Sequence, residues 1–336
     1  MANRVVTILL IVLTTVALLG EAARNVAERE GQWQEWLRLL VAQQVADTLD
    51  RQVAVGPITD LSLDGVTVGS VAVAEGYYLA NGAVARADTL KIAFDLPGIL
   101  RQDVAPAAGI STVNVEDAWV HVVRDPQGDL NVQDLLPEPE EPPPPPEDRF
   151  QGVVTVSNST VIYDDYAVDT VSGMPLNVEL AQVDAQIDMR EIGWAVIELS
   201  GRERLGRFGA LAVQGQTELD TGFTWANATI GSIDAAYWFD RFVETPDLDV
   251  QSGTVDVAGT FGLMPQETGE PERTVAADVT IRDAAVTLAA LNGRQVVADM
   301  SLTGTMDGAQ IHSLDARMGT TNIDATGFIG DWDEPV

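Results

Sequence analysis

Apolar and polar residues alternate along most of the chain between residues 53 and 329. An alternation of period two is typical of β-strands that bury one face. Gly, Asp and Asn separate the alternating runs, as they do at turns between strands. Helical patterns are scarce, and we expect only turns or short helices at 96–100 and 235–243. The sequence therefore predicts a mostly β fold.

One pattern of eight residues recurs along these runs. It reads apolar, any, apolar, any, Asp/Asn/Gly, small or apolar, any, then Val or Ile. Its copies begin at Leu61, Val113, Val154, Phe223 and Val279. The fifth position, which is Gly65, Asp117, Asn158, Asn227 or Asp283, suits a bend or bulge, because Gly, Asn and Asp tolerate left-handed backbone angles. We interpret the pattern as a strand–kink–strand unit used five times in an extended, repetitive β architecture.

The strand-like runs predict a sheet with two different faces. One face carries Asp, Thr, Gln and Ser, and the other carries small and aliphatic residues. The candidate lining of the apolar face is Val255, Val257, Val275, Ala277, Val279, Ile281, Met300 and Leu302. A second sheet packed on this face would explain it. A trough whose apolar floor holds something other than protein would explain it too. The apolar face is light in large aromatic residues, which weakens the case for a dense core and is compatible with the trough.

The amino-terminal 22 residues are predicted to form a signal anchor that remains as a transmembrane helix. Its apolar residues are Val5, Val6, Ile8, Leu9, Leu10, Ile11, Val12, Leu13, Val16, Leu18 and Leu19. A cleaved signal peptide is the alternative, but Gly20-Glu21-Ala22 is a poor cleavage site. A short amphipathic helix is expected at 23–50. Its apolar stripe, from Trp33 and Trp36 to Val41 and Val45, suits packing on the end of the sheet.

Eleven residues from Glu138 to Asp148 include five consecutive prolines, Pro142 to Pro146. Such a stretch is a stiff, exposed spacer. We expect a linker at 137–149 that divides a first β segment, 51–136, from a second, 150–336. A strand-like run reaches almost to Val336, so we expect the sequence to be the first part of a longer chain.

Charge and composition exclude several functions. With 51 acidic and 19 basic residues the formal net charge is −32, which disfavours binding to nucleic-acid phosphates. The chain has no cysteine, and its two histidines, His121 and His312, stand alone, without the partners of a metal or nucleophile site. The pair Asp164-Asp165 after Tyr163 is expected by chance among 51 acidic residues and lies at a strand end, where turns prefer Asp. The stretch 247–253 lacks the spacing of a calcium loop. We expect no enzymatic activity, no metal and no cofactor.

The segment Arg124-Asp-Pro-Gln-Gly-Asp-Leu-Asn-Val-Gln-Asp-Leu-Leu136 resembles the "R-D-x-x-G-x-x-N-[LVI]-x-x-L-L" segment of the TamB/AsmA-like family. Its motif positions here are Arg124, Asp125, Gly128, Asn131, Leu135 and Leu136. The order around it is also similar, with an anchor, a helix and strands before it, then the proline-rich break and Phe150–Val156. The resemblance covers residues 1 to about 165 in order, and the later part in style only.

The resemblance implies an inner-membrane protein with one membrane-spanning helix and the bulk of the chain in the periplasm. It also implies an elongated, curved antiparallel β-sheet whose apolar groove moves phospholipid between membranes or assists outer-membrane protein assembly. An outer-membrane barrel partner would engage regions that this sequence does not include. The alternative is a membrane-anchored structural or adhesive β-repeat protein without cargo. We place Asn131 as a structural residue at a tight turn.

Overall fold

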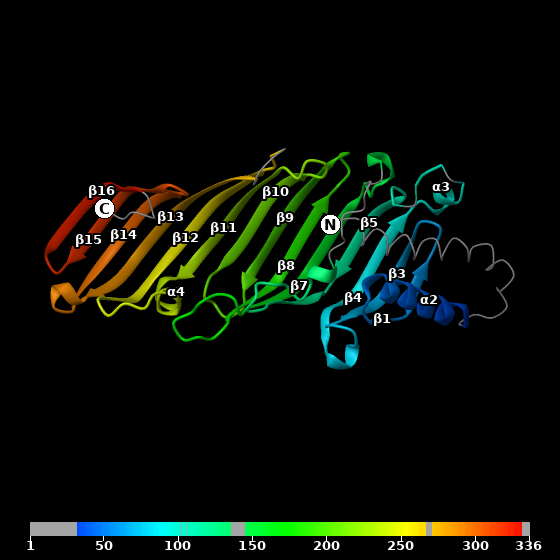
Figure 1. Cartoon of the computed structure of the whole chain (residues 1–336), viewed down its shortest axis with the longest axis horizontal. Helices are drawn as coiled ribbons and strands as arrows, with labels where there is room; N and C mark the ends of the chain where they lie inside the picture. The colour runs from blue at the N-terminus through cyan, green and yellow to red at the C-terminus, as the bar shows by residue number, and fades with distance from the viewer. Residues whose placement is uncertain (1–31, 102, 106, 136–144, 267–270, 331–336) are drawn as a thin grey trace. The chain divides into compact units, whose positions relative to one another are not determined.

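A computed structural model describes residues 32–101, 103–105, 107–135, 145–266 and 271–330 (Figure 1). The first half contains α2 (Gln32–Leu49), β1 (Val53–Val55), β2 (Ile58–Leu61), β3 (Gly65–Ala74), η1 (Leu79–Asn81), β4 (Ala83–Phe94), α3 (Leu96–Leu100), β5 (Ile110–Glu116), β6 (Trp119–Arg124), η2 (Gln133–Leu135), η3 (Pro146–Asp148) and β7 (Val153–Asp165). The second half contains β8 (Leu176–Asp188), β9 (Trp194–Glu203), β10 (Ala210–Glu218), β11 (Thr224–Asp234), α4 (Ala235–Phe242), β12 (Leu248–Met264), β13 (Glu272–Leu288), η4 (Ala289–Leu291), β14 (Arg294–Thr305), β15 (Gly308–Met318) and β16 (Thr321–Gly330).

The fold is mostly β, as predicted, and the sixteen strands of the described residues belong to one sheet. The strand order is β1-β3-β4-β5-β7-β8-β9-β10-β11-β12-β13-β14-β15-β16, with β2 beside β3 and β6 between β4 and β7. The pairs among β1–β6 and among β10–β16 are antiparallel, as expected, whereas β7 runs parallel to β5 and β6. A parallel pair needs a long crossover, and the chain between β6 and β7, which includes the proline-rich stretch, is that connection.

The backbone divides into two compact units. The first unit comprises Met1–Ala167 with Ala181–Val196, and the second comprises Val168–Leu180 with Ile197–Val336. The expected linker lies inside the first unit, where the strands on either side of it pair directly. The expected domain boundaries otherwise stay a prediction.

The core of the first unit lies between α2 and the sheet. Val41 and Val45 of the expected apolar stripe are buried, as is Leu49 one turn later, and they pack on apolar residues of β1, β3, β4 and β5. Val66, Ile92 and Val113, which face one another across three strands, each expose only 4% of their surface. The side chains of Trp33 and Trp36 lie outside the described part. Period-two strands and a helix of period 3.6 thus bury their apolar sides on each other.

Positive backbone φ angles mark bulges inside the strands. Asp117, Asn158 and Asp283 have φ of 54°, 50° and 50°, which confirms three of the five predicted kinks. The other two predictions are wrong. Gly65 closes a tight turn at the start of β3, and Asn227 pairs regularly with Gln214 and Thr260. In β3 and β11 the non-glycine residues with a left-handed φ are instead Ser70 and Ser232. Gln182 in β8 has a left-handed φ as well.

A carboxylate on the next strand holds three of these bulges. The backbone amide of Asn158 donates to Asp184 Oδ1 at 2.9 Å. The amides of Ser232 and Asp283 donate in the same way to Asp256 and Asp299, at 2.7 and 2.8 Å. A bulge leaves its extra residue without a ladder partner, so the carboxylate supplies the missing acceptor. These three polar-face acids therefore have a structural role in the repeat.

The predicted membrane anchor at 1–22 lies outside the described residues. Within the described part, no helix combines the length and the apolar character that crossing a bilayer requires. The anchor, and with it the membrane location, stays a prediction.

Candidate functional site

The apolar face of the second unit is the candidate functional site. Hydrogen-bonded register aligns apolar residues directly across neighbouring strands. The central row runs through Leu211, Ile230, Val257, Val279, Leu302 and Ile311. A second row runs through Ile233, Val255, Ile281, Met300 and Leu314. We call one surface the apolar face. It comprises these two rows, the row of small residues described below, and Phe261 with Val275.

All eight predicted lining residues lie on the apolar face. Val257, Val279 and Leu302 belong to the central row, and Val255, Ile281 and Met300 to the second. Ala277 stands between Gly259 and Gly304, and Val275 stands opposite Phe261. Alternation predicted this shared face because the period of two is a local property of a strand, and the role of the eight residues as a lining stays a prediction.

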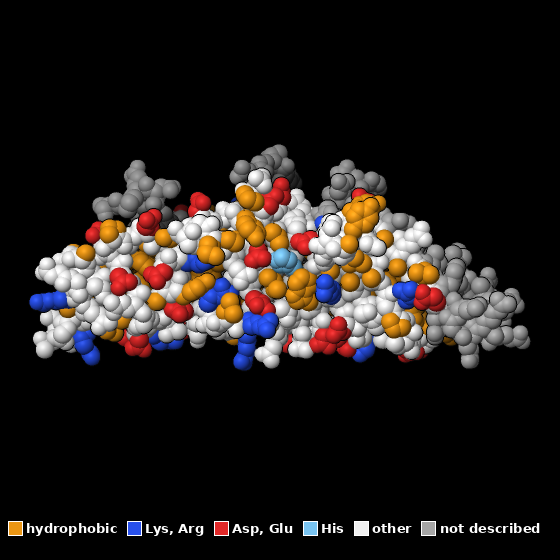
Figure 2. Space-filling model, turned by 90° about the horizontal axis from the view of Figure 1, so that it is seen from below, with side chains coloured by type: hydrophobic (Ala, Val, Ile, Leu, Met, Phe, Trp, Pro, Cys, Tyr) orange, Lys and Arg blue, Asp and Glu red, His pale blue; other side chains and the backbone are white. Residues whose placement is uncertain are grey.

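The apolar face is only partly shielded from solvent. Seven of the eight residues are half-buried, and Val275 exposes 45% of its surface. In the first unit, where α2 covers the sheet, Val66, Ile92 and Val113 each expose only 4% of their surface. Those three residues show the burial of a covered face in this chain. In the described part of the chain all strands belong to one sheet, and no second sheet packs on this face there. Figure 2 shows hydrophobic side chains at the surface between acidic and basic ones.

A row of small residues crosses the apolar face beside the central row. It runs through Val213, Ala228, Gly259, Ala277, Gly304 and Ala309. A methyl group added at Gly259 or Gly304 would meet no atom closer than 3.6 Å or 3.9 Å, respectively. Close backbone packing therefore does not explain these glycines. The larger residues of the central row lie on one side of the row of small residues, and on β12 and β13 Phe261 and Val275 lie on the other.

The buried polar network of the second unit lies at the ends of its strands. Arg207 donates through Nε to Glu203 Oε1 at 2.8 Å and through Nη1 to the Asn177 carbonyl at 2.6 Å. Burial alone would lower the pKa of Arg207, but its hydrogen bonds to Tyr237 and Glu203 raise it above the usual value. Trp238 of α4 donates to the Arg207 carbonyl at 3.1 Å. The network fixes α4 to the sheet and leaves Arg207 no role as a free cation.

The segment that carries the family resemblance forms a tight turn after β6. Asp125 Oδ1 accepts from the amides of Gln127 and Asp129, both at 2.9 Å, and Gly128 has a φ of 95°. Asn131 accepts from the Val123 amide at 2.9 Å and donates to the His121 carbonyl at 3.0 Å. Its amide thus continues the ladder along β6, which is a structural use.

The outer motif positions contact other parts of the first unit. Arg124 reaches Asp165 at 3.4 Å, and Leu135 packs against the core. Leu136 lies outside the described residues. The motif therefore organises the turn, and none of its described residues faces an open site.

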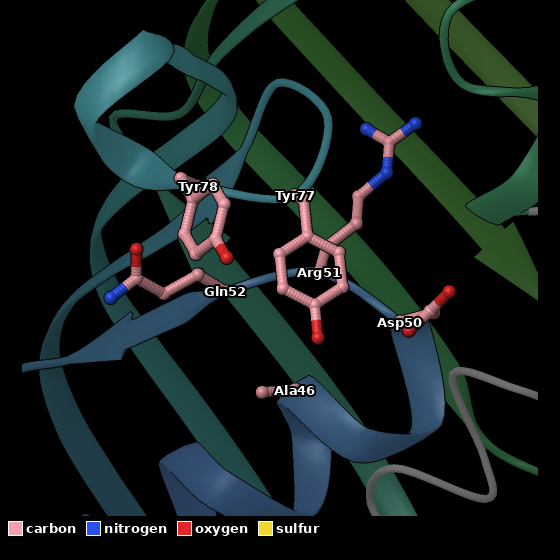
Figure 3. Close-up of a pocket in the computed structure, with 6 residues that line it drawn as sticks. All are labelled: Ala46, Asp50, Arg51, Gln52, Tyr77 and Tyr78. Atoms are coloured by element: carbon pink, nitrogen blue, oxygen red, sulfur yellow. The ribbon is translucent and has the colours of Figure 1, made fainter.

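A cavity of about 320 Å³ lies at the end of α2, lined by Ala46, Asp50, Arg51, Gln52, Tyr77 and Tyr78. The two tyrosine rings lie side by side near Gln52, and the Arg51 guanidinium points away from Ala46 (Figure 3). Arg51 donates to the carbonyls of Ala74 and Asn131, and Gln52 accepts from the Leu79 amide at 2.9 Å. Arg51 and Gln52 thus use their polar groups to bond backbone atoms of the protein. We therefore interpret the cavity as a surface depression beside the core.

The histidines have ordinary polar partners. His121 Nε2 lies 2.8 Å from Asp164, and His312 Nε2 lies 2.8 Å from the Thr303 hydroxyl. The Thr303 hydroxyl also donates to Asp278 Oδ1 at 2.5 Å. In the described part of the chain, no group of His, Cys, Asp and Glu side chains is arranged to hold a metal ion.

Neither the protein-family models nor the curated proteins contain a match to the sequence of this chain. The resemblance to the TamB/AsmA-like family thus rests on the segment 124–136 and the order of elements around it.

Proposed function

We propose that this chain is a membrane-anchored envelope protein whose apolar face forms a groove for phospholipid acyl chains. In this role it moves phospholipid between membranes or assists outer-membrane protein assembly, as the family resemblance implies. The observation that carries the proposal is the apolar face itself, which is in register over seven strands and half-exposed.

Lipid explains this face better than a protein partner does. A protein partner would need specific packing against the face, whereas an acyl chain gains from any apolar surface at about 25 cal/mol per Å². The row of small residues lies perpendicular to the strands, so an acyl chain lying in it contacts every strand in turn. Larger residues on both sides would confine the chain to this path.

The other face of the same strands keeps the sheet in water. Asp256, Thr280 and Ser301 form one of its rows, and they alternate with the residues of the apolar face. A groove of this kind separates hydrocarbon from solvent with a single layer of backbone. The acidity of the chain is then a matter of solubility.

Site-specific photo-cross-linking in cells tests the proposal on the full chain. A photoreactive amino acid at Val279 would sit on the apolar face, and the same group at Thr280 would sit on the opposite face as the matched control. We expect phospholipid adducts at position 279 and none at position 280, detected by mass spectrometry of the purified chain. Adducts only to protein at position 279, or equal lipid labelling at both positions, would overturn the lipid proposal and favour a structural or adhesive protein.

A further inference from the structure

Charged residues of the second unit are sorted by sign between the two sides of the sheet. We call the side that carries the apolar face the apolar side. Eight acids of strands β11–β16 pair across strands, and each pairs on the side away from the apolar face. They are Asp234, Asp249, Asp256, Glu272, Asp278, Asp299, Asp315 and Asp324. Of the remaining acids in β10–β16, Glu218 alternates with Thr217 and Asp283 is the left-handed residue of a bulge.

Two arginines are the only charged residues that pair across β10–β16 on the apolar side. Arg273 lies at the start of β13, in line with Val275, and Arg294 is the first residue of β14. The other arginines of these strands, Arg282 and Arg317, stand on the opposite side. A chain with 51 acidic and 19 basic residues thus places only cations beside its apolar face.

Arg273 is exposed and carries a charge that no neighbour uses. Within the described part of the chain it makes no hydrogen bond and no ion pair. Other arginines of the second unit do pair with acids, as Arg282 does with Asp256 and Arg204 with Glu179. A guanidinium is always charged, so Arg273 presents its full set of donors to whatever lies at this margin of the apolar face.

The row that contains Arg273 forms a polar margin close to the row of small residues. It runs through Thr217, Thr224, Leu263 and Arg273, and the two threonine hydroxyls lie 2.9 Å apart. Ala277 of the row of small residues is about 13 Å from Arg273 along β13, at about 3.3 Å per residue. The methylenes of an arginine can lie on apolar surface while its guanidinium stays in water. This margin therefore has the polarity of the boundary between a lipid headgroup and its acyl chains.

We propose that Arg273 binds the phosphate of the phospholipid whose acyl chains lie on the apolar face. The inference rests on the proposed function and adds to it the place and the chemical class of the headgroup, a phosphodiester anion. Arginine suits this role because its planar fork donates two parallel hydrogen bonds to a phosphate. Arg294 stands opposite Leu288, about 35 Å from Ala277 along β13, and is too distant to share that headgroup.

A fatty acid offers a similar anion in its carboxylate. The apolar face is several rows wide, at about 6–7 Å from one row to the next along a strand. A single acyl chain would leave most of that width bare, whereas a lipid with two chains buries more of it. Phospholipid therefore fits the face better.

Labelling of the purified full chain by fluorescent lipids tests the proposal. The chain carries a photoreactive amino acid at Val279 and is mixed, in a non-ionic detergent, with phosphatidylglycerol, diacylglycerol or a fatty acid. All three carry the same fluorescent acyl chain. We expect phosphatidylglycerol to label the chain about three- to tenfold more than the uncharged diacylglycerol does. In Arg273→Gln the two lipids should label the chain equally.

Arg317→Gln is the matched control, because it removes an exposed arginine from the opposite side of the same unit. It should keep the preference for phosphatidylglycerol. Arg273→Lys should give an intermediate preference, since lysine keeps the charge and loses the paired donors. Arg273 has no bonded neighbour to lose, so the circular dichroism and the urea midpoint of Arg273→Gln should match those of the wild type.

Three results would overturn the role of Arg273 and leave the groove in place. They are equal labelling of the wild type by phosphatidylglycerol and diacylglycerol, an unchanged preference in Arg273→Gln, and an equal loss in Arg317→Gln. Stronger labelling by the fatty acid than by phosphatidylglycerol would assign the cation to a carboxylate and overturn the phosphate. If no lipid labels position 279, the proposed function fails together with this inference.

Discussion

Replacing Val279 by aspartate separates an open apolar face from a covered one. Val279 stands between Val257 and Leu302 in the central row and is half-buried. Full burial of a valine is worth about 1.5–3 kcal/mol, so the half-buried side chain contributes about 1 kcal/mol. Aspartate is also a poor strand residue, at a cost of up to about 1 kcal/mol. Water can reach the carboxylate on an open face, so Val279→Asp should destabilise the fold by about 1–2 kcal/mol.

Val113→Asp provides the matched comparison. Val113 also lies in the middle of a strand and faces apolar residues on both sides, but it exposes only 4% of its surface. The new carboxylate would be buried without a partner, which costs several kcal/mol in addition to the lost apolar contact. We expect a loss of more than about 5 kcal/mol, enough to unfold a domain of ordinary stability.

Urea denaturation followed by circular dichroism measures both variants. We expect Val279→Asp to keep its β signal with a lower urea midpoint, and Val113→Asp to lose, without urea, the part of the β signal that the first unit contributes. In cells, Val279→Asp should also abolish lipid cross-linking from a photoreactive group at position 257. If Val279→Asp unfolds as Val113→Asp does, the apolar face is covered by protein and the groove is wrong.

Three further predictions concern polar residues. Asn131→Leu removes both bonds to β6 and should lower stability in thermal denaturation by about 1–3 kcal/mol; an unchanged melting temperature would refute the structural role. Glu203→Gln leaves Arg207 buried without its carboxylate and should cost about 3–5 kcal/mol in urea, whereas a change below about 1 kcal/mol would mean that the pair is solvated. The pKa of Asp315 is raised, first by a hydrogen bond to Asp324, then by desolvation and then by repulsion from Asp324 and Asp299. The ionised form of Asp315 therefore destabilises the fold above that pKa, and this penalty fades as the pH falls. Asp315→Asn should therefore raise the urea midpoint at about pH 7 and leave it unchanged below about pH 3; a lower midpoint at neutral pH would contradict this.

Local sequence patterns predicted the strands and their faces. The eight candidate residues share one face of the sheet because alternation determines the face of each residue without knowledge of its neighbours, whereas their role as a groove lining stays a prediction. The kinks at Asp117, Asn158 and Asp283 were also readable, since Asp and Asn tolerate left-handed angles. Gly65 permits such an angle but does not require one, and Asn227 pairs instead as an ordinary strand residue.

Long-range features could not be read from the sequence. Ser232 has no local preference for a left-handed angle, and the bond of its amide to Asp256, 24 residues further along, accompanies the bulge. The parallel placement of β7 depends on where a long crossover returns. The union of all strands in one sheet depends on every pairing together. The acidic row of Asp299, Asp315 and Asp324 exists only because two registers align it.

The most direct test of the groove extends photo-cross-linking across four strands. Photoreactive groups at Ile230, Val257, Val279 and Leu302 would follow the central row over β11, β12, β13 and β14. The matched controls on the opposite face are Thr229, Ala258, Thr280 and Thr303. A continuous groove predicts phospholipid adducts at all four row positions and at none of the controls. Adducts confined to one strand, or protein adducts along the row, would contradict it.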